Sequence, residues 1–334
     1  MDLTRIERAW VRSPRLTRVK AFLSVLLVAA AAAFSEAAQQ PPTCPPETRA
    51  PSTQEIEVGM RNARDRGFLW RIVKDGRASY LYGTIHVGRL EWTFPGPETL
   101  KAFRASDRLA LELDVSDPDI IQRLQKGTAL KPGSALKEPF GERLRAQLKI
   151  ACLSEQLLGL VAPEMLATTL TAMAARSQGF DPAYAVDAAL AGLARGHGKP
   201  VASLETPELQ LKLLLGGSQA ESQALVESAL DELEKGKASD MLAHMTDVWS
   251  LGRLGELEAY ERWCECVETE AERAMMRRLL DERNPGLASG IDAIHASGRT
   301  VFAAVGSLHM IGRAGLPALL SERGYKVERI AFKP

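Results

Sequence analysis

Short apolar segments that alternate with long helical stretches constrain the fold of this chain more than any other feature of its sequence. Each segment is a short, largely apolar run of the length typical of a strand. Helical periodicity fills residues 118–196 and 207–297 almost without interruption. Strands separated by helices favour an α/β sheet with crossover connections. The predicted strands lie at residues 68–76, 78–86, 108–115, 199–205, 299–309 and 325–332.

The chain is therefore predicted to be an α/β (α+β) protein, with a central mixed sheet flanked by helices. The folded domain is expected over residues 67–334, with a large helical insertion at about residues 118–298. Asp75-Gly76 joins the first two strands, and Asp-Gly is a typical hairpin turn. The 42 basic and 42 acidic residues balance, which leaves no basic face for a phosphate backbone. Nucleic acid is therefore not an expected partner.

The first 37 residues have the features of a secretory signal peptide. Six basic residues precede an apolar run at residues 21–34, and Ser35-Glu36-Ala37 offers small residues before a cleavage point. The run is shorter than the roughly 20 residues that cross a bilayer, so no stable membrane insertion is expected after cleavage. A retained N-terminal anchor is the alternative. Residues 38–66, rich in Pro and Gln, are predicted to be a linker, and the domain is expected in the periplasm or secreted.

Four cysteines follow the predicted signal peptide: Cys44, Cys152, Cys264 and Cys266. Export permits disulfide bonds between them. Cys44 is expected to pair with Cys152 or with one of the other two, because a bond between Cys264 and Cys266 would close a strained ring. A metal-binding pair at this C-x-C sequence is the alternative, but no second pair of cysteines accompanies it.

Two G-x-x-H motifs stand at the ends of predicted buried strands, Gly83 to His86 and Gly306 to His309. In open α/β sheets, ligands bind beyond the carboxyl ends of the strands, where both histidines are expected. Glycine lets a ligand approach the backbone closely, so Gly83 and Gly306 are candidate cofactor-binding positions. The alternative is a pair of core histidines bonded to the backbone.

Acidic residues stand at two further strand ends. Alternation places Glu112 and Asp114 on one face of the third predicted strand, and Glu205 follows the fourth. A buried carboxylate needs a cation, a metal ion or a role in proton transfer. Arg283-Asn284, at a helix break ahead of the last histidine motif, could orient these carboxylates or a substrate; a surface helix junction is the alternative.

Two imidazoles and a carboxylate form a ligand set typical of a divalent metal ion. Such an ion makes bound water nucleophilic at neutral pH, so the sequence favours a hydrolase with His86, His309 and Glu112 as ligands. Glu112, Glu205, Arg283 and Asn284 are the candidate catalytic residues. The sequence has no H-E-x-x-H, G-x-S-x-G, phosphate-loop or dinucleotide-binding motif, and the corresponding enzyme classes are not indicated.

Five segments together resemble the TraB/GumN family, which includes PrgY and the animal Tiki proteins. They are LYGTIHVG, DRLALELD, AVDAALAGLARGHGKPVASLET, ERNPGLASGI and VFAAVGSLHMIGRAGLPALLSERGYKVERI. The resemblance covers roughly residues 67–332. It implies a fold similar to erythromycin esterase and to ChaN-type haem-binding proteins.

This resemblance also implies an activity. Tiki proteins are described as proteases that depend on manganese or cobalt, with two G-x-x-H motifs and an acidic residue that correspond here to His86, His309 and Glu112. A peptide or protein is then the expected substrate. Asp187, together with the other candidate residues, stands at a position that recurs in bacterial members. Two alternatives stay open: a peptide-binding or haem-binding protein without turnover, and a metal-free hydrolase similar to an esterase.

Overall fold

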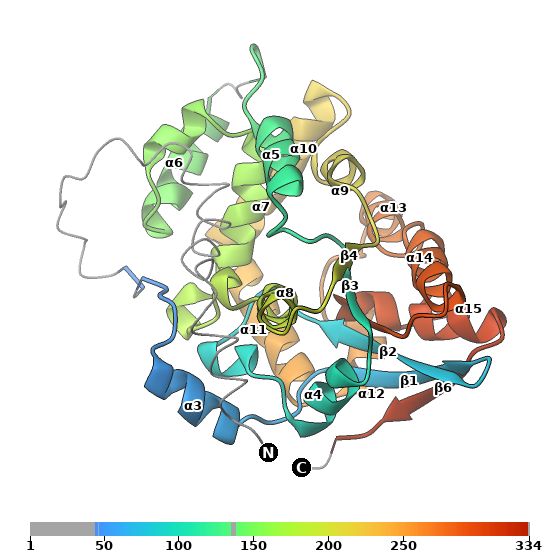
Figure 1. The fold of residues 1–334 in the computed structure, drawn as a ribbon. Helices are drawn as coiled ribbons and strands as arrows, with labels where there is room; N and C mark the ends of the chain where they lie inside the picture. The colour runs from blue at the N-terminus through green and yellow to red at the C-terminus, as the bar shows by residue number, and fades with distance from the viewer. Residues whose placement is uncertain (1–43, 46, 135–137, 333–334) are drawn as a thin grey trace.

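A single six-stranded mixed sheet, in the order β4-β3-β5-β2-β1-β6, forms the centre of the protein. The computed structural model describes residues 44–45, 47–134 and 138–332, and Figure 1 shows the sheet with helices around it. The predicted fold class is confirmed. The strands are β1 (Phe68–Lys74), β2 (Arg77–Thr84), β3 (Arg108–Leu111), β4 (Val201–Ser203), β5 (Val301–Gly306) and β6 (Lys326–Ile330).

Four neighbouring strands, β4, β3, β5 and β2, run parallel. Strand β1 pairs antiparallel with both β2 and β6, so it alone of the six strands runs against the others, and β1 and β2 form the predicted hairpin. Because parallel strands need crossover connections, helices separate these four strands along the chain. Their carboxyl ends meet at one edge of the sheet, which is where ligands bind in open α/β sheets.

Helices cover the sheet and extend beyond it. The helical insertion has a hydrophobic core of its own, made by leucines of α6 and α7 with Val226 and Leu230 of α10, and Figure 1 shows α5, α6, α7 and α10 grouped away from the sheet. No helix in the described part of the chain combines the length and the apolar character that a bilayer span requires. The helices are α3 (Thr53–Arg61), α4 (Pro97–Arg104), α5 (Pro118–Thr128), α6 (Phe140–Ile150), α7 (Pro163–Met173), α8 (Val186–Gly196), α9 (Pro207–Leu214), α10 (Gln219–Glu234), α11 (Lys237–Ser250), α12 (Leu254–Glu258), α13 (Glu270–Leu279), α14 (Asn284–Ala296) and α15 (Leu316–Glu322).

Part of the predicted linker is a helix, α3. The Ser52 side chain accepts a hydrogen bond from the Glu55 amide, and the Glu55 carboxylate accepts one from the Ser52 amide, which is a capping box. Ile56 is buried, and Met60 packs against the main core. The polar composition around this segment did not indicate a helix. One capping box and two apolar side chains, Ile56 and Met60, dock it on the core. The predicted signal peptide lies outside the described residues.

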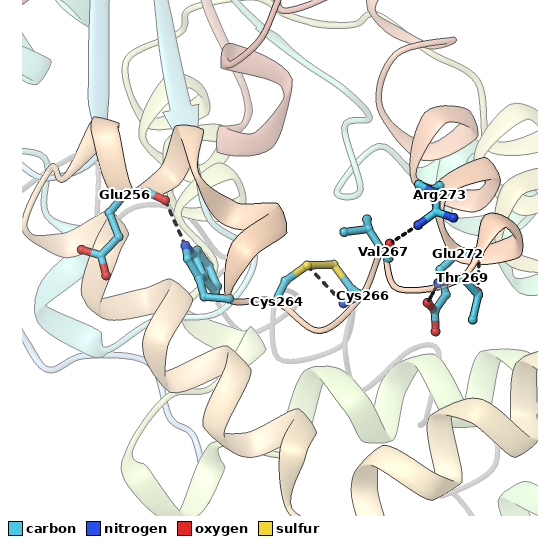
Figure 2. The surroundings of a disulfide bond; sticks show 8 residues. Glu256, Cys264, Cys266, Val267, Thr269, Glu272 and Arg273 are labelled. Carbon is cyan, nitrogen blue, oxygen red and sulfur yellow. Dashed lines mark hydrogen bonds between the residues drawn. A yellow bond between two sulfur atoms is a disulfide. The ribbon is translucent and has the colours of Figure 1, made fainter.

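Both disulfide bonds that four cysteines allow are present. Cys44 pairs with Cys152, one of the expected partners, and Cys264 pairs with Cys266 (Figure 2). The expectation that ring strain excludes this second pair is wrong. Glu265 adopts a left-handed backbone conformation with φ of 50°, which turns the chain between the two cysteines. With its sulfur atoms joined, the C-x-C sequence is not a metal-binding pair.

Polar contacts fasten α14 to the sheet, and this helix begins at the predicted Arg283-Asn284 junction. Asp292 accepts hydrogen bonds from the Tyr325 hydroxyl at 2.8 Å and from the Lys74 ammonium at 3.1 Å. These contacts, with the Tyr325 hydrogen bond first, hold the pKa of Asp292 below its usual value. The same carboxylate therefore contributes to the position of α14 on the sheet.

Substituting Asp292→Asn should lower the free energy of unfolding at pH 7 by about 1 kcal/mol, because the charged hydrogen bonds are weakened. A carboxylate with a lowered pKa stabilises the fold above its unfolded pKa, and this stabilisation is lost as the pH falls below about 4. The difference in the free energy of unfolding between variant and wild type should therefore become smaller in acid. Urea unfolding followed by tryptophan fluorescence measures it, with Asp240→Asn, an exposed change on α11, as control. An equal loss at every pH would contradict this role.

Candidate functional site

The residues that follow the four parallel strands converge at one edge of the sheet. Glu112 follows β3, and Glu205 stands just beyond β4. The Glu205 amide donates to the Glu112 carbonyl at 2.9 Å, which continues the pairing of these strands past their ends. His86 follows β2, and His309 lies in the 3-10 turn η6 (Ser307–Met310) after β5. The structure therefore brings together the predicted histidines and carboxylates.

Arg283, directly before α14, binds both carboxylates. Its Nε and Nη2 atoms donate to the two oxygens of Glu205 at 2.8 and 2.5 Å, and Nη2 also donates to Glu112 Oε2 at 2.5 Å. The Arg283 and Glu112 side chains are each 11% exposed and that of Glu205 is 3% exposed. Burial alone would lower the pKa of Arg283, but Glu205 and Glu112 outweigh it and raise the pKa. The guanidinium therefore stays charged between two buried acids.

His309 is buried and held in one orientation by Asn284. The Asn284 amide nitrogen donates to the Ala314 carbonyl, so its oxygen faces His309 Nδ1 at 2.6 Å and accepts the proton there. That assignment leaves the lone pair on Nε2, where Arg283 Nη1 donates at 3.2 Å. Burial lowers the pKa of His309, which favours the neutral ring. Asn284 itself is 1% exposed, so it positions His309 and does not face solvent.

His86 differs from His309 because its side chain is 62% exposed, against 4%. Its Nδ1 lies 3.3 Å from Asp187 Oδ2, at the start of α8. The Asp187 charge raises the pKa of His86 to about 9. The other oxygen, Asp187 Oδ1, is buried and has no hydrogen-bond partner among the described residues. His86 therefore forms the open side of the site, and Asp187 orients its ring.

Glu112 lies between the two imidazoles. Its Oε1 atom accepts from the Gly306 amide at 2.7 Å and lies 4.0 Å from His86 Nε2, whereas Oε2 lies 3.9 Å from His309 Nε2. Burial would raise the pKa of Glu112, but His309, His86 and Arg283 outweigh it and lower the pKa to about 2. The carboxylate is therefore ionised at neutral pH, and each oxygen faces one ring nitrogen.

The two motif glycines have different surroundings. A Cβ atom on Gly306 would lie 3.1 Å from Glu112 Oε1 and 3.6 Å from His86 Nε2. The space between these groups therefore exists because residue 306 has no side chain. A Cβ atom on Gly83 would instead meet Ser307, 3.0 Å from its hydroxyl oxygen. Gly83 thus allows β2 to pack closely against the second histidine motif.

The donor set fits a divalent metal ion, although it is not drawn together around one. No three His, Cys, Asp or Glu side chains in the described ranges form a ready-made metal site. The N–O distances of 3.9 and 4.0 Å are somewhat longer than those between ligands of one small ion. Still, both Nε2 atoms lie near the Glu112 carboxylate, and both Nδ1 atoms are held by acceptors, as is usual for metal-binding histidines. With its raised pKa, His86 carries a proton at neutral pH that a metal ion would displace.

Several residues were not assigned correctly from the sequence. Asp114 was expected beside Glu112, but it pairs with Arg195, and its side chain is 7% exposed. Gln210 on α9 donates to Glu205 Oε2 at 3.2 Å and was not anticipated. Its position one helical turn after Thr206, the N-cap of α9, is the only sequence signal that could have indicated it.

The sequence profile of the TraB/PrgY/gumN family matches residues 68–329, from β1 to β6. The chain belongs to the TraB/PrgY/gumN family. The match includes every residue of the site described above. The resemblance of the five sequence segments to this family is thereby confirmed.

Curated relatives of this TraB/PrgY/gumN family member match it over a shorter stretch. Metalloprotease TIKI1 of Danio rerio is 37% identical over 83 residues, which is 25% of this chain and 17% of the relative. Metalloprotease TIKI1 of Homo sapiens is 33% identical over 101 residues, which is 30% of this chain and 20% of the relative. Metalloprotease TIKI homolog of Nematostella vectensis is 35% identical over 83 residues, which is 25% of this chain and 17% of the relative. The match thus spans a fifth or less of each of these relatives.

No solved structure matches this family member. The comparison with erythromycin esterase and with ChaN-type proteins therefore stays a prediction.

Substituting Arg283→Met should destabilise the metal-free protein by about 3 kcal/mol, because two buried carboxylates lose their cation. Arg283→Lys should destabilise the protein less, since an ammonium keeps the charge, although without the bidentate geometry. Urea unfolding at pH 7 measures both effects. The exposed Arg313, four residues after His309, provides the control Arg313→Met, which should leave stability within about 0.5 kcal/mol of wild type. Equal stability of Arg283→Met and the control would contradict the buried cluster.

Proposed function

We propose that this protein is a metal-dependent hydrolase that cleaves a peptide or protein, with His86, His309 and Glu112 as the metal ligands. The convergence of two Nε2 atoms and one ionised carboxylate, around the space left by Gly306, carries this proposal. Relatives named metalloproteases support a peptide substrate. Manganese or cobalt is the proposed ion, following the family resemblance.

A divalent ion in this position would make bound water nucleophilic and polarise a substrate carbonyl. The chain's own residues would bind the ion and orient its ligands. His86, on the open side, marks the face from which a substrate approaches, and the buried His309 forms the closed side. Asp187 and Asn284 hold the Nδ1 atoms, which keeps both Nε2 atoms directed at the site.

Arg283 and Glu205 have a positioning role in this proposal. Glu205 is 3% exposed at its side chain and is engaged by Arg283 and Gln210, so it holds the guanidinium in place. Arg283 in turn fixes one oxygen of Glu112. Its Nη1 atom contacts His309 Nε2, so a metal ion can bind that nitrogen only when Nη1 moves aside.

We also propose that the protein works in the periplasm or after secretion. The predicted signal peptide supports export. The two disulfide bonds support it as well, because disulfides persist in oxidising compartments.

Metal binding should raise the unfolding midpoint of EDTA-treated protein in proportion to the logarithm of the ion concentration, since the ion binds the native state. Mn²⁺, Co²⁺ and Zn²⁺ are titrated separately, and hydrolysis of a peptide library is measured with each ion. His86→Ala and His309→Ala should lose both the shift and the cleavage. His244→Ala, a change of a partly exposed histidine on α11 away from the sheet edge, should keep both.

Two results would redirect the interpretation. A midpoint that no ion changes, with cleavage that resists EDTA, would replace the proposal with a metal-free hydrolase. A metal-dependent shift without cleavage of any peptide would indicate a binding protein on the same scaffold.

Gly306→Ala tests the space between the ligands separately from the ligands themselves. The added Cβ would force the Glu112 carboxylate to shift by a few tenths of an ångström. Metal affinity should fall at least about tenfold, as measured by isothermal titration, while the far-ultraviolet circular dichroism stays that of wild type. Ala303→Gly, elsewhere in β5, is a control for altered backbone entropy. Unchanged metal affinity in Gly306→Ala would contradict a site at this position.

A further inference from the structure

A cavity of about 310 Å³ lies in the helical insertion between α6, α7 and α10. Its volume falls within the range of small-molecule binding sites. None of the residues of the candidate hydrolase site lines it. It is therefore a separate feature of the protein, and its chemistry can be read independently of the proposed function.

Most of the cavity wall is apolar. Leu170 and Met173 of α7 and Leu233 of α10 line it, and Ile150 at the end of α6 contributes from a position that is 70% exposed. Pro45 completes the wall, and the neighbouring Cys44–Cys152 disulfide ties this segment to the end of α6. The cavity can therefore accept a short hydrocarbon chain.

Gln147 lines this apolar cavity with a polar group. The residue is only 7% exposed, and its side-chain amide forms no hydrogen bond with another described residue, although the amide is not among the polar atoms sealed from solvent. The amide is therefore free to donate to or accept from a group bound in the cavity. The Gln147 side chain thus offers a hydrogen bond to a polar group of a ligand.

The charges around the cavity specify the sign of that polar group. Lys149 and Arg176 line the cavity, and no acidic side chain does. Arg176 is already engaged by Asp181 at 2.6 Å. Lys149 is exposed, and no described residue forms an ion pair or hydrogen bond with its ammonium. An anionic group is therefore favoured beside Lys149.

We propose that this cavity binds a small amphipathic carboxylate, such as a medium-chain fatty acid. Its hydrocarbon chain lies against Leu170, Met173 and Leu233. Its carboxylate lies beside Lys149 and accepts a hydrogen bond from the Gln147 amide. This site requires neither a metal ion nor hydrolysis.

The probe for this site is decanoate, below its critical micelle concentration, titrated into the disulfide-bonded protein by calorimetry. Saturable 1:1 binding and a higher unfolding midpoint are expected in the wild type. Lys149→Glu should weaken binding about tenfold or more, because an attractive charge is replaced by a repulsive one. Ala174→Phe, which fills the cavity, should abolish binding. Lys126→Glu, an exposed change on α5 outside the cavity, is the matched control and should bind as wild type.

Decylamine and decanol separate the contribution of the carboxylate from that of the chain. Both should bind at least about tenfold more weakly than decanoate, because neither carries a negative charge. The proposal is overturned if the wild type does not bind decanoate, if both cavity variants bind it as the control does, or if decylamine binds equally well. Circular dichroism checks that each variant is folded. If either Lys149→Glu or Ala174→Phe does not fold, the other variant still tests the site.

Discussion

The ion cluster of Arg283 with Glu112 and Glu205 is the interaction on which the rest of the site depends. Two parallel strands end in carboxylates that lie side by side and are almost fully buried. Neither charge would be tolerated there without a cation, because an uncompensated buried ion is far more costly than a paired one. One guanidinium for two carboxylates leaves an excess of negative charge. The cluster is therefore stable without a metal ion and still attracts a positive one.

Much of the fold follows from local patterns. The apolar strands, the Asp75-Gly76 hairpin and the helical crossovers together predict a mixed sheet, and each strand is found where its pattern indicates. The site follows from topology as well. Because parallel strands share one edge, residues at four strand ends must come together even though they are far apart in sequence. This is why both histidines and both glutamates could be placed from the sequence.

Other features depend on contacts that no local pattern encodes. Glu112 and Asp114 share a strand face in sequence, but β3 ends at Leu111, so the alternation no longer holds and Asp114 turns to Arg195. The pairing of Cys264 with Cys266 depends on the backbone angle of the single residue between them. The position of Arg283 could be suspected from a helix break. Its two carboxylate partners, however, are fixed by how α14 docks on the sheet.

The place of β5 in the sheet has a consequence for the order in which the protein can form. This strand lies at the centre, between β3 and β2, yet of the described strands only β6 follows it in the sequence. A chain that ends before Val301 has a gap in the middle of its sheet, and it also lacks Gly306 and His309. The central sheet and the site can therefore be completed only when the segment from Val301 to His309 has joined the fold. A chain cut before Val301 cannot have this site, whatever part of the helical insertion it contains.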